Sequence, residues 1–417
     1  MAGYDVDPPD NQALTIKVTT PGGGTIVQYN NFYSYDYVSH FLSPSDTGTF
    51  TLDTAELSTA DVQALSLGAR LEVSLNDVVQ SIGNIDDLHY HGSRQGGSLL
   101  EVRFRDWLAR AVDAELDPQG VRYMDANTFD QLLTATFAPF GVKAFVNDNA
   151  ANRNAIRGRK YGVKSSKRSG KPLKSYVLHE LKPYDNEGAF AFASRVSQRF
   201  GLWLWPAVDG QTLVVSSPEF NQDASYTIQH KLDSSSIHNN VLDWAVTKSR
   251  REQPWFIVAR GFGGGGADPK TSMQSIIINP YIQTTLNPAS FYPNTRAVIP
   301  PFDVDQYSDL SFIPIDDPSA APQFLRDTES HNAGQLASFL LRELSLRTRK
   351  LLTASYTIEG HALNGQPIAL DTIIDVDDDV TNLHLQLWII GRRFHKAAGS
   401  SGTTTTIECI LPGTLVF

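Results

Sequence analysis

Two histidines in the segment "DDLHYH" are the first residues whose spacing could support chemistry. His89 and His91 are two positions apart, so in a strand both imidazoles would lie on one face, near Asp86 and Asp87. Imidazole and carboxylate groups are ligands for zinc. However, the spacing supplies no third ligand, and the polar end of a hairpin explains the same residues. We therefore expect no metal at this position.

An acidic run, "DVDDDV" (375–380), has the density of carboxylate oxygens that calcium prefers. It lacks the glycine at the sharp bend and the closing glutamate of an EF-hand loop. We interpret it as a solvated acidic turn between two strands.

Glycines in "FGGGG" and "SGKPL" are typical of phosphate-binding loops, but the Walker pattern needs Ser or Thr after Gly-Lys, and here Pro172 follows Lys171. Neither G-x-S-x-G nor H-E-x-x-H occurs. Cys409 lies in "IECIL", where a packed thiol is expected rather than a nucleophile. No pair of carboxylates stands out for glycoside hydrolysis. We therefore expect no catalytic residues, no cofactor and no metal, and a protein that is not an enzyme.

Composition indicates a globular protein of two or three domains. The 417 residues are 41% hydrophobic and 19% charged. No apolar run approaches the ~18 residues of a membrane span, and the polar, acidic start resembles neither a secretory signal nor a transit peptide. One cysteine excludes an intrachain disulfide. We expect a soluble protein completed in a reducing cytosol. The formal charge of −10 argues against a dedicated nucleic-acid binder.

Period-two patterns predict strands in the first hundred residues. Residues 14–20, 47–54, 70–76 and 98–106 alternate apolar and polar side chains and are separated by turn residues. This spacing predicts a small antiparallel barrel or sandwich.

A helical period begins at Asp106. Residues 106–116, 127–141 and 185–201 each place apolar side chains on one helical face. The segment 175–181 reads as a strand, and 202–217 as a hairpin turning at Asp209-Gly210. These elements together predict an α/β unit.

The rest of the chain returns to strands. Residues 239–261 are expected to form a long hairpin, 262–327 to be rich in loops, and 331–350 to form a helix. Four further strands are expected after residue 350. The apolar face expected of the helix consists of Leu336, Phe339, Leu340, Leu344 and Leu346.

Two distant segments share an order of features. "SIGNIDDLHYHGSRQGGSLLEVRF" and "IIGRRFHKAAGSSGTTTTIECIL" each contain a strand with Ile-Gly, polar residues with His, a Gly/Ser turn and an alternating strand. Two ordinary hairpins would give the same order by chance, so the existence of two related β domains stays open here.

The predicted fold class is α+β and mostly β, with two small antiparallel β-barrel-like domains flanking an α/β domain. The first β domain is expected at 1–105 and the α/β domain at 106–220, with a basic loop at 150–174. The second β domain is expected at 221–417, including the loop-rich segment 262–327 and the helix 331–350.

The order of these parts resembles a known family. The segments "LEVRFRDWLARAVD", "YVLHELKPYDNEGAFAFASRVSQRFGLWLWPAVDGQTLVVSS" and "LNGQPIALDTIIDVDD" are similar, with the elements between them, to baseplate hub proteins of contractile phage tails. The relatives are the Mu-like hub and late control protein D families and the hub portion of type VI secretion spikes. The resemblance covers roughly residues 70 to 417.

The resemblance implies a structural role in the virion, in the tail baseplate, with assembly in the host cytoplasm. Such hubs are trimers whose two β domains per chain form a pseudo-six-fold ring, so the resemblance adds assembly as a trimeric ring to the predicted fold class. The ring joins the hexameric tail tube to the trimeric central spike. The implied partners are two further copies of the chain, the tube, the spike and other baseplate proteins, with the tape measure protein as a further candidate. No small-molecule substrate and no specific nucleic acid are implied. A tail-associated cell-wall-degrading enzyme and a carbohydrate-binding β-sandwich protein are the alternatives.

A basic stretch stands out in this acidic chain. From Asn149 to His179 there is no Asp or Glu, and nine Lys and Arg occur. A solvated loop and a contact for an acidic partner, such as a neighbouring hub subunit, both remain open. Nucleic-acid binding is disfavoured because proteins that bind single strands stack bases on several aromatic side chains, and Tyr161 is the one aromatic residue within 157–174. The candidate contact residues are Arg157, Arg159, Lys160, Lys164, Lys167, Arg168, Lys171 and Lys174.

Overall fold

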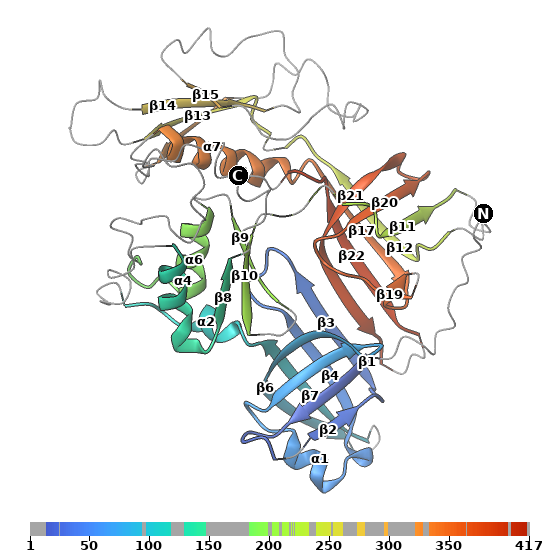
Figure 1. Cartoon of the computed structure of the whole chain (residues 1–417). Coiled ribbons are helices and arrows are strands. Elements are labelled where there is room, and N and C mark those ends of the chain that lie inside the picture. The colour runs from blue at the N-terminus through green and yellow to red at the C-terminus, as the bar shows by residue number, and fades with distance from the viewer. Residues whose placement is uncertain are drawn as a thin grey trace.

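The computed structural model (Figure 1) carries three main sheets. The residues that it describes are 14–24, 26–93, 97–117, 129–146, 183–198, 202–207, 211–216, 218, 220, 222–232, 239–251, 253–261, 273–279, 296–298, 322–327, 333–363, 365–398 and 402–414.

Thirteen strands form the largest sheet. Its main path runs β12-β17-β22-β21-β3-β4-β7-β6-β5-β1-β2, and β11 joins it through β20. The strands are β1 (Leu14–Thr19), β2 (Ile26–Tyr29), β3 (Ser34–His40), β4 (Thr47–Asp53), β5 (Arg70–Leu75), β6 (Val78–Ser93), β7 (Gly97–Asp106), β11 (Tyr226–His230), β12 (Asp243–Lys248), β17 (Leu352–Glu359), β20 (Ile373–Asp378), β21 (Leu383–Lys396) and β22 (Thr404–Ile410).

The alternating pattern of the sequence explains these strands. In β1, every second side chain is buried, and the expected strands at 47–54 and 70–76 are confirmed as β4 and β5. Between β4 and β5 lie the short helices η2 (Thr54–Glu56) and α1 (Thr59–Ala64). The barrel-like expectation is corrected: the described strands close no barrel, because the path ends openly at β12 and β2.

Where the sequence predicts an α/β unit, a second sheet shares a core with three helices. This sheet has the order β8-β10-β9, with β9 and β10 paired as the predicted hairpin and β8 parallel to β10. The strand expected at 175–181 lies outside the described residues. The elements are α2 (Ala109–Asp113), α4 (Phe129–Phe137), η3 (Ala138–Phe140), β8 (Lys143–Val146), α6 (Ala189–Gln198), β9 (Trp203–Pro206) and β10 (Thr212–Ser216).

Helix α7 (Ala333–Thr348) packs on a third sheet with the order β15-β14-β13-β16. Leu336, Leu340 and Leu344 are buried there, as expected, together with Leu341, whereas Leu346 is half-buried. None of the described helices is long and apolar enough to cross a membrane. The strands are β13 (Phe256–Gly261), β14 (Met273–Ile278), β15 (Arg296–Val298) and β16 (Gln323–Asp327), and a separate pair is β18 (Ala362–Leu363) with β19 (Gln366–Pro367).

This third sheet corrects two expectations. Residues 239–261 do not form one hairpin, because β12 belongs to the largest sheet and β13 to the sheet under α7. The segment 262–327, which was expected to be rich in loops, contributes the strands β14, β15 and β16.

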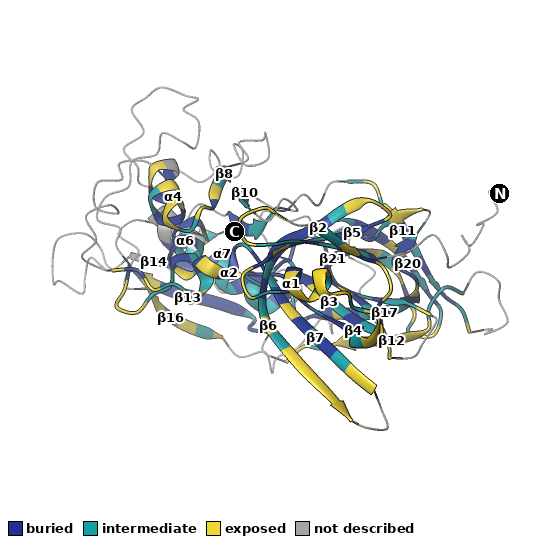
Figure 2. Ribbon diagram, turned by 90° about the horizontal axis from the view of Figure 1, so that it is seen from below, coloured by how far each residue is buried: buried dark blue, intermediate teal, exposed yellow. Residues whose placement is uncertain are grey.

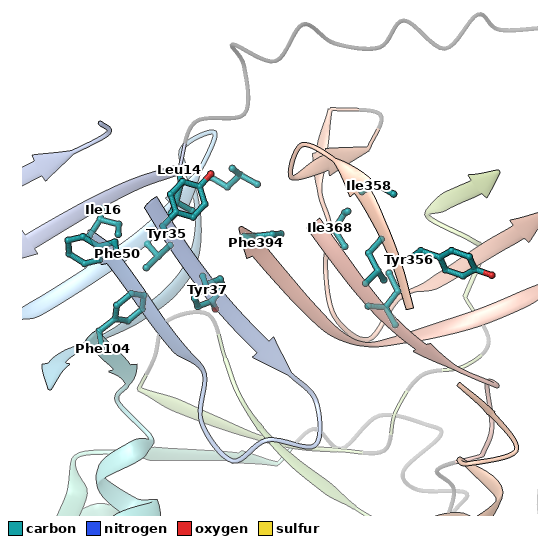
Figure 3. Close-up of a cluster of buried hydrophobic side chains, with 14 of the residues drawn as sticks. Leu14, Ile16, Tyr35, Tyr37, Phe50, Phe104, Tyr356, Ile358, Ile368 and Phe394 are labelled. Atoms are coloured by element: carbon teal, nitrogen blue, oxygen red, sulfur yellow. The ribbon is translucent and has the colours of Figure 1, made fainter. Parts of the chain in front are cut away.

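One apolar core runs along the largest sheet. It includes residues from both ends of the chain, and Figure 3 shows Phe394 of β21 between Tyr37 of β3 and the group that contains Tyr356 and Ile368. Cys409 is buried in this core, and burial raises the pKa of its thiol above the usual range. The expectation of a packed thiol is confirmed.

Candidate functional site: two strand repeats and their junction

The largest sheet contains the same arrangement of four strands twice. In chain order, the first repeat is β4, β5, β6 and β7, and the second repeat is β17, β20, β21 and β22. In the first repeat, β4 pairs with β7, β7 with β6, and β6 with β5. In the second, β17 pairs with β22, β22 with β21, and β21 with β20. All of these pairs are antiparallel, so the two repeats share one topology.

A bulge in each long strand fixes which residues correspond. The register shifts between Ile85 and Asp87 in β6, and between Ile389 and Gly391 in β21. Counting from these bulges, Asp87 takes the position of Gly391. The similarity between the two segments in the sequence is therefore present as two long hairpins, but Gly83 is not the counterpart of Gly391.

The aligned repeats carry similar side chains. Residues 49–53 of β4 read "TFTLD", and the corresponding residues 355–359 of β17 read "SYTIE". In β5 and β20, "LEV" (71–73) corresponds to "IDV" (374–376). Phe50 and its counterpart Tyr356 are both fully buried. The likeness therefore extends from topology to the core-facing positions.

Strand β3 joins the two repeats. It pairs with β4 on one side and with the distal half of β21, from Gly391 to Lys396, on the other. Arg393 of β21 forms an exposed ion pair with Asp36 of β3, with Nε 2.8 Å from Oδ1. Strand β3, which directly precedes the first repeat in the chain, therefore continues the sheet beside the second repeat.

Buried polar contacts reinforce this junction. The hydroxyl of Tyr35 lies 2.6 Å from Nε2 of His361, whose Nδ1 lies 2.9 Å from Oγ1 of Thr405. Burial disfavours the charged imidazolium and lowers the pKa of His361 to about 3. His361 is therefore neutral and is within hydrogen-bond distance of side chains from β3 and from β22 of the second repeat.

A second buried group lies at the end of β7. Asp106 accepts hydrogen bonds from the backbone N–H of Asp46 (2.9 Å) and from the hydroxyl of Ser45 (2.8 Å). Burial and the neighbouring Asp46 raise the pKa of Asp106 to about 7. Asp46 in turn accepts a hydrogen bond from the hydroxyl of Tyr37 at 2.8 Å. These contacts anchor β3 to β7 beside the junction.

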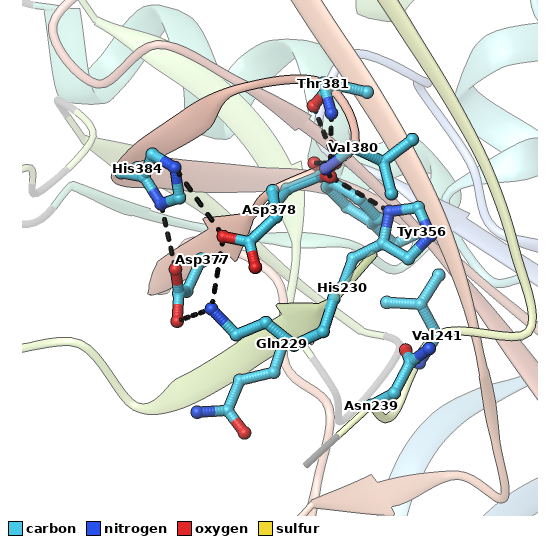
Figure 4. A network of polar contacts seen from close by, with 12 residues as sticks. Gln229, His230, Asn239, Val241, Tyr356, Asp377, Asp378, Val380, Thr381 and His384 are labelled. Atoms are coloured by element: carbon cyan, nitrogen blue, oxygen red, sulfur yellow. Dashed lines mark hydrogen bonds and ion pairs between the residues drawn. The ribbon is translucent and has the colours of Figure 1, made fainter. Parts of the chain in front are cut away.

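The acidic run at 375–380 is only partly the solvated turn that we expected. Asp378 is fully buried and accepts hydrogen bonds from the hydroxyls of Tyr356 (3.0 Å) and Thr381 (2.7 Å), and its Oδ1 lies 2.9 Å from Nδ1 of His230 (Figure 4). Burial opposes ionisation, but these hydrogen bonds outweigh it, so the pKa of Asp378 is lowered.

The same turn carries the one group with metal-ligand geometry in the described part of the chain, Asp377, Asp379 and His384. The ammonium of Lys231 lies 2.5 Å from Asp377 and 3.3 Å from Asp379, and His384 Nδ1 lies 2.8 Å from Asp377 (Figure 4). Lys231 therefore already supplies positive charge between the carboxylates. We interpret the group as an ion network that ties β11 to β20 and β21.

The remaining motifs of the sequence lie apart from this network or outside the described residues. His89 and His91 lie exposed on β6, opposite Glu101 and Leu99, and belong to no metal-ligand group among the described residues. The glycine segments 262–266 and 169–173 lie outside the described residues. The basic stretch, with all eight of its candidate contact residues, also lies outside them.

The outer faces of the two repeats differ in charge. In the first repeat, a hollow of about 570 Å³ is lined by charged side chains that include Glu101, Arg103 and Arg105. In the second repeat, the positions of Arg103 and Glu101 are taken by Glu408 and Thr406. The repeats therefore share their backbone and their core, but not the charge of this face.

Comparison with known proteins identifies the fold. No protein-family model and no curated protein matches the sequence. A tail protein from Neisseria meningitidis MC58 superposes with a TM-score of 0.68 at 16% identity, over 97% of this chain and 98% of that one. The 43 kDa tail protein of prophage MuSo2 from Shewanella oneidensis gives 0.67 at 15% identity, over 97% and 99%. The chain has the fold of phage tail proteins.

A further likeness is to a chain of a complex of two proteins. One chain of a PdpA–VgrG complex superposes with a TM-score of 0.52 at 11% identity, over 97% of this chain and 66% of that chain. The phage tail fold of this protein is thus shared with a chain of that complex.

Proposed function

We propose that this protein is the central hub of a contractile tail or tail-like injection particle. In this role, three copies form a ring that joins the hexameric tail tube to the trimeric spike, and the protein resides in the baseplate. The tail-protein fold supports this proposal, as does the resemblance of the sequence to baseplate hubs. The two repeats, with the strands beside them, correspond to the two β domains of such a hub.

The observation that carries the proposal is the pair of strand repeats. Three chains with two repeats each present six positions with the same backbone topology, which is the number that a six-fold tube ring requires. A single repeat, or two unrelated β domains, would not offer six equivalent positions. The match of "TFTLD" with "SYTIE" at buried positions supports a duplicated unit.

The difference between the outer faces fits the same role. An adaptor between six-fold and three-fold partners needs one surface that is alike in all six repeats and another that distinguishes alternate repeats. The change from Arg103 to Glu408 at corresponding positions gives such a distinction. A trimeric spike could therefore bind one kind of repeat from each chain.

We further propose that the basic stretch contacts an acidic partner, either a neighbouring hub subunit or another baseplate protein. Nine basic and no acidic residues between Asn149 and His179 in a chain of charge −10 support this. The eight candidate residues from Arg157 to Lys174 would act together, because exposed ion pairs contribute little singly.

The rival role, a cell-wall-degrading enzyme, has a direct test. The purified protein should leave cell-wall material undigested in a zymogram. A cleared zone that is absent from a control preparation without this protein would overturn the structural role. The second rival, carbohydrate binding, is distinguished by the oligomeric state, because a hub should be trimeric and should co-purify with spike and tube proteins.

The oligomeric state tests the hub itself. Light scattering on the purified chain should give a mass near three times that of the 45.9 kDa monomer, either alone or after the spike protein of the same particle is added. A stable dimer at all concentrations would contradict the proposal, because two chains cannot present six equivalent repeats.

A further inference from the structure

The two long strands differ in what covers their distal halves. Residues Gly391–Lys396 of β21 pair with β22 on one side and with β3 on the other. The corresponding residues 87–92 of β6 pair with β7, but within the described residues no strand pairs with their other edge. Figure 2 shows this end of the β6–β7 hairpin projecting from the molecule with its residues exposed.

The chain also contains a second strand placed like β3. Strand β3 pairs with β4 through Tyr35 opposite Phe50, and β12 pairs with β17 through Trp244 opposite Tyr356. Phe50 and Tyr356 are counterparts in the two repeats, so β12 is the counterpart of β3. The other edge of β3 is covered by β21, whereas β12 ends the path of described strands.

Corresponding aromatic side chains are buried where the strand edge is covered and exposed where it is not. Phe394 of β21 is fully buried, but its counterpart Tyr90 on β6 is 57% exposed. Tyr35 of β3 is 5% exposed, but its counterpart Trp244 on β12 is 43% exposed. Two large aromatic side chains are therefore exposed at the two edges where the repeat lacks the pairing that buries their counterparts.

We propose that β12 of one copy pairs antiparallel with residues 87–92 of β6 in a neighbouring copy. This repeats between chains the β3–β21 junction that exists within each chain, and it rests on the proposed trimeric hub. The register of that junction, Tyr37 opposite Phe394, places Val246 opposite Tyr90. It also places Thr247 opposite His89.

The chemistry of the two edges supports this pairing. Unpaired backbone groups on a long edge strand favour the addition of another strand. Tyr90 and Val246 would form a cross-strand apolar pair on the face that continues the core, since Val246 already packs against it. Asp87 would lie opposite Ser249, whose neighbours are Lys248 and Arg250, so the charges are complementary.

The geometry of the pairing leads to a ring. Each chain donates β12 and accepts at β6, so the interface joins two different surfaces, and such a head-to-tail interface closes into a ring when its rotation permits. Intrachain β3–β21 junctions and interchain β12–β6 junctions would then alternate around three chains. All six repeats would be joined by the same kind of strand pairing.

Disulfide trapping tests the pairing in the full-length protein. Directly opposed residues in antiparallel strands have Cβ atoms about 4.5–5.5 Å apart, so His89→Cys combined with Thr247→Cys should cross-link on mild oxidation. The native Cys409 is buried and gives a clean background. The double variant should yield covalent products of up to three chains on a non-reducing gel.

The matched controls test whether the interface joins two different surfaces, β12 of one chain and β6 of the next. Either cysteine variant alone should give no product, and a mixture of the two should give covalent dimers only, because each donor strand meets one acceptor. His89→Cys with Lys248→Cys places the thiols on opposite faces and should not cross-link. Cross-linking of a single variant with itself would mean a two-fold interface and would overturn the proposal.

A second variant tests the same edge without cysteine chemistry. Tyr90→Asp places a charge in the proposed contact but touches no core of the single chain, so melting of the monomer should stay unchanged. The concentration at which the trimer dissociates should rise about tenfold or more, whereas Tyr90→Phe should leave it unchanged. Normal trimers in Tyr90→Asp would overturn the β12–β6 pairing.

Light scattering and cross-linking together separate the edge pairing from the trimeric hub on which it rests. A trimer by light scattering without a cross-link at His89 and Thr247 overturns the edge pairing and leaves the hub in place. A stable dimer overturns the trimeric hub, and the edge pairing with it.

Discussion

Arg392 Nη1 lies 2.8 Å from Gln80 Oε1, and this buried contact connects the long strands of the two repeats. Arg392 is 6% exposed, and its guanidinium also donates to the carbonyl of Ile368 and lies over the rings of Tyr37 and Phe394. The free-energy cost of burying this charge is offset by its hydrogen-bond partners, so the loss of any one of them destabilises the fold.

Removal of the Gln80 amide should therefore destabilise the fold. Gln80→Leu leaves the Arg392 guanidinium without one acceptor, at an expected cost of about 2–4 kcal/mol in the free energy of unfolding. Adding Arg392→Met to this variant should recover part of the loss, because the buried charge is removed as well. Denaturant unfolding measures both effects.

The control for this prediction is Gln386→Leu. Gln386 donates to Asp375 at 3.0 Å in an exposed contact, so its loss should cost less than about 1 kcal/mol. Equal costs for Gln80→Leu and Gln386→Leu would mean that the buried contact contributes nothing special.

His361 should make stability depend on acid. Its folded pKa of about 3 lies below the ordinary 6.5, so below pH 6.5 the unfolded chain takes up a proton that the folded chain does not. The contribution is complete above pH 6.5 and is lost as the pH falls toward 3, by up to about 1.4 kcal/mol per pH unit. Unfolding at several pH values between 4.5 and 7 for wild type and His361→Gln should reveal a shallower slope in the variant.

Between pH 4.5 and 7, Asp106 makes the free energy of unfolding depend on pH in the opposite direction to His361. Its folded pKa of about 7 lies above the ordinary 3.8, so its contribution is complete below pH 3.8 and is lost as the pH rises toward 7. The difference between wild type and His361→Gln removes this common effect. Parallel pH profiles for the two proteins would show that His361 can be protonated in the folded state.

Helix α7 offers a comparison of one substitution at two positions. Leu340 is fully buried against the third sheet, so Leu340→Asp should lower the free energy of unfolding by several kcal/mol or prevent folding of that layer. Leu346 is half-buried on the same helix, and Leu346→Asp should cost clearly less. Thermal melting of both variants measures the contrast, and similar melting would mean that the buried face is misplaced.

The basic stretch should act collectively and weaken with salt. Neutralising Arg157, Lys160, Lys167 or Arg168 singly should change binding by about 0.2–1 kcal/mol, whereas the quadruple variant should slow or prevent assembly and keep its melting temperature. The effect should shrink as ionic strength rises. Trypsin should cut the stretch in the free protein and spare it in the particle. Normal assembly of the quadruple variant, with equal cutting in both states, would leave only a solvated loop.

Local patterns in the sequence predict many elements because the positions that a strand or a helix buries are apolar, and they recur at the period of that element. Strands β1, β4 and β5, helices α4, α6 and α7, and the β9–β10 hairpin all follow from such periods. The period also indicates the buried face of α7, since Leu336, Leu340 and Leu344 recur at helical spacing.

The spacing of apolar residues does not indicate which strands pair with each other. Alternation specifies the face of a strand but not its neighbour, so the sequence places β12 and β13 in one hairpin although they belong to different sheets. The sequence predicts a solvated turn at 375–380 because nothing local shows that His230 and Tyr356 meet Asp378. The correspondence of "TFTLD" with "SYTIE" becomes visible only once the bulges set the register.

Electron cryomicroscopy of the particle that contains this protein can locate the chain and count its copies. We expect three copies of the chain in one ring between tube and spike, with six β repeats related by nearly six-fold symmetry. Each tube subunit should then face one repeat. A copy number other than three, or a position of the chain away from the junction of tube and spike, would contradict the role as a hub.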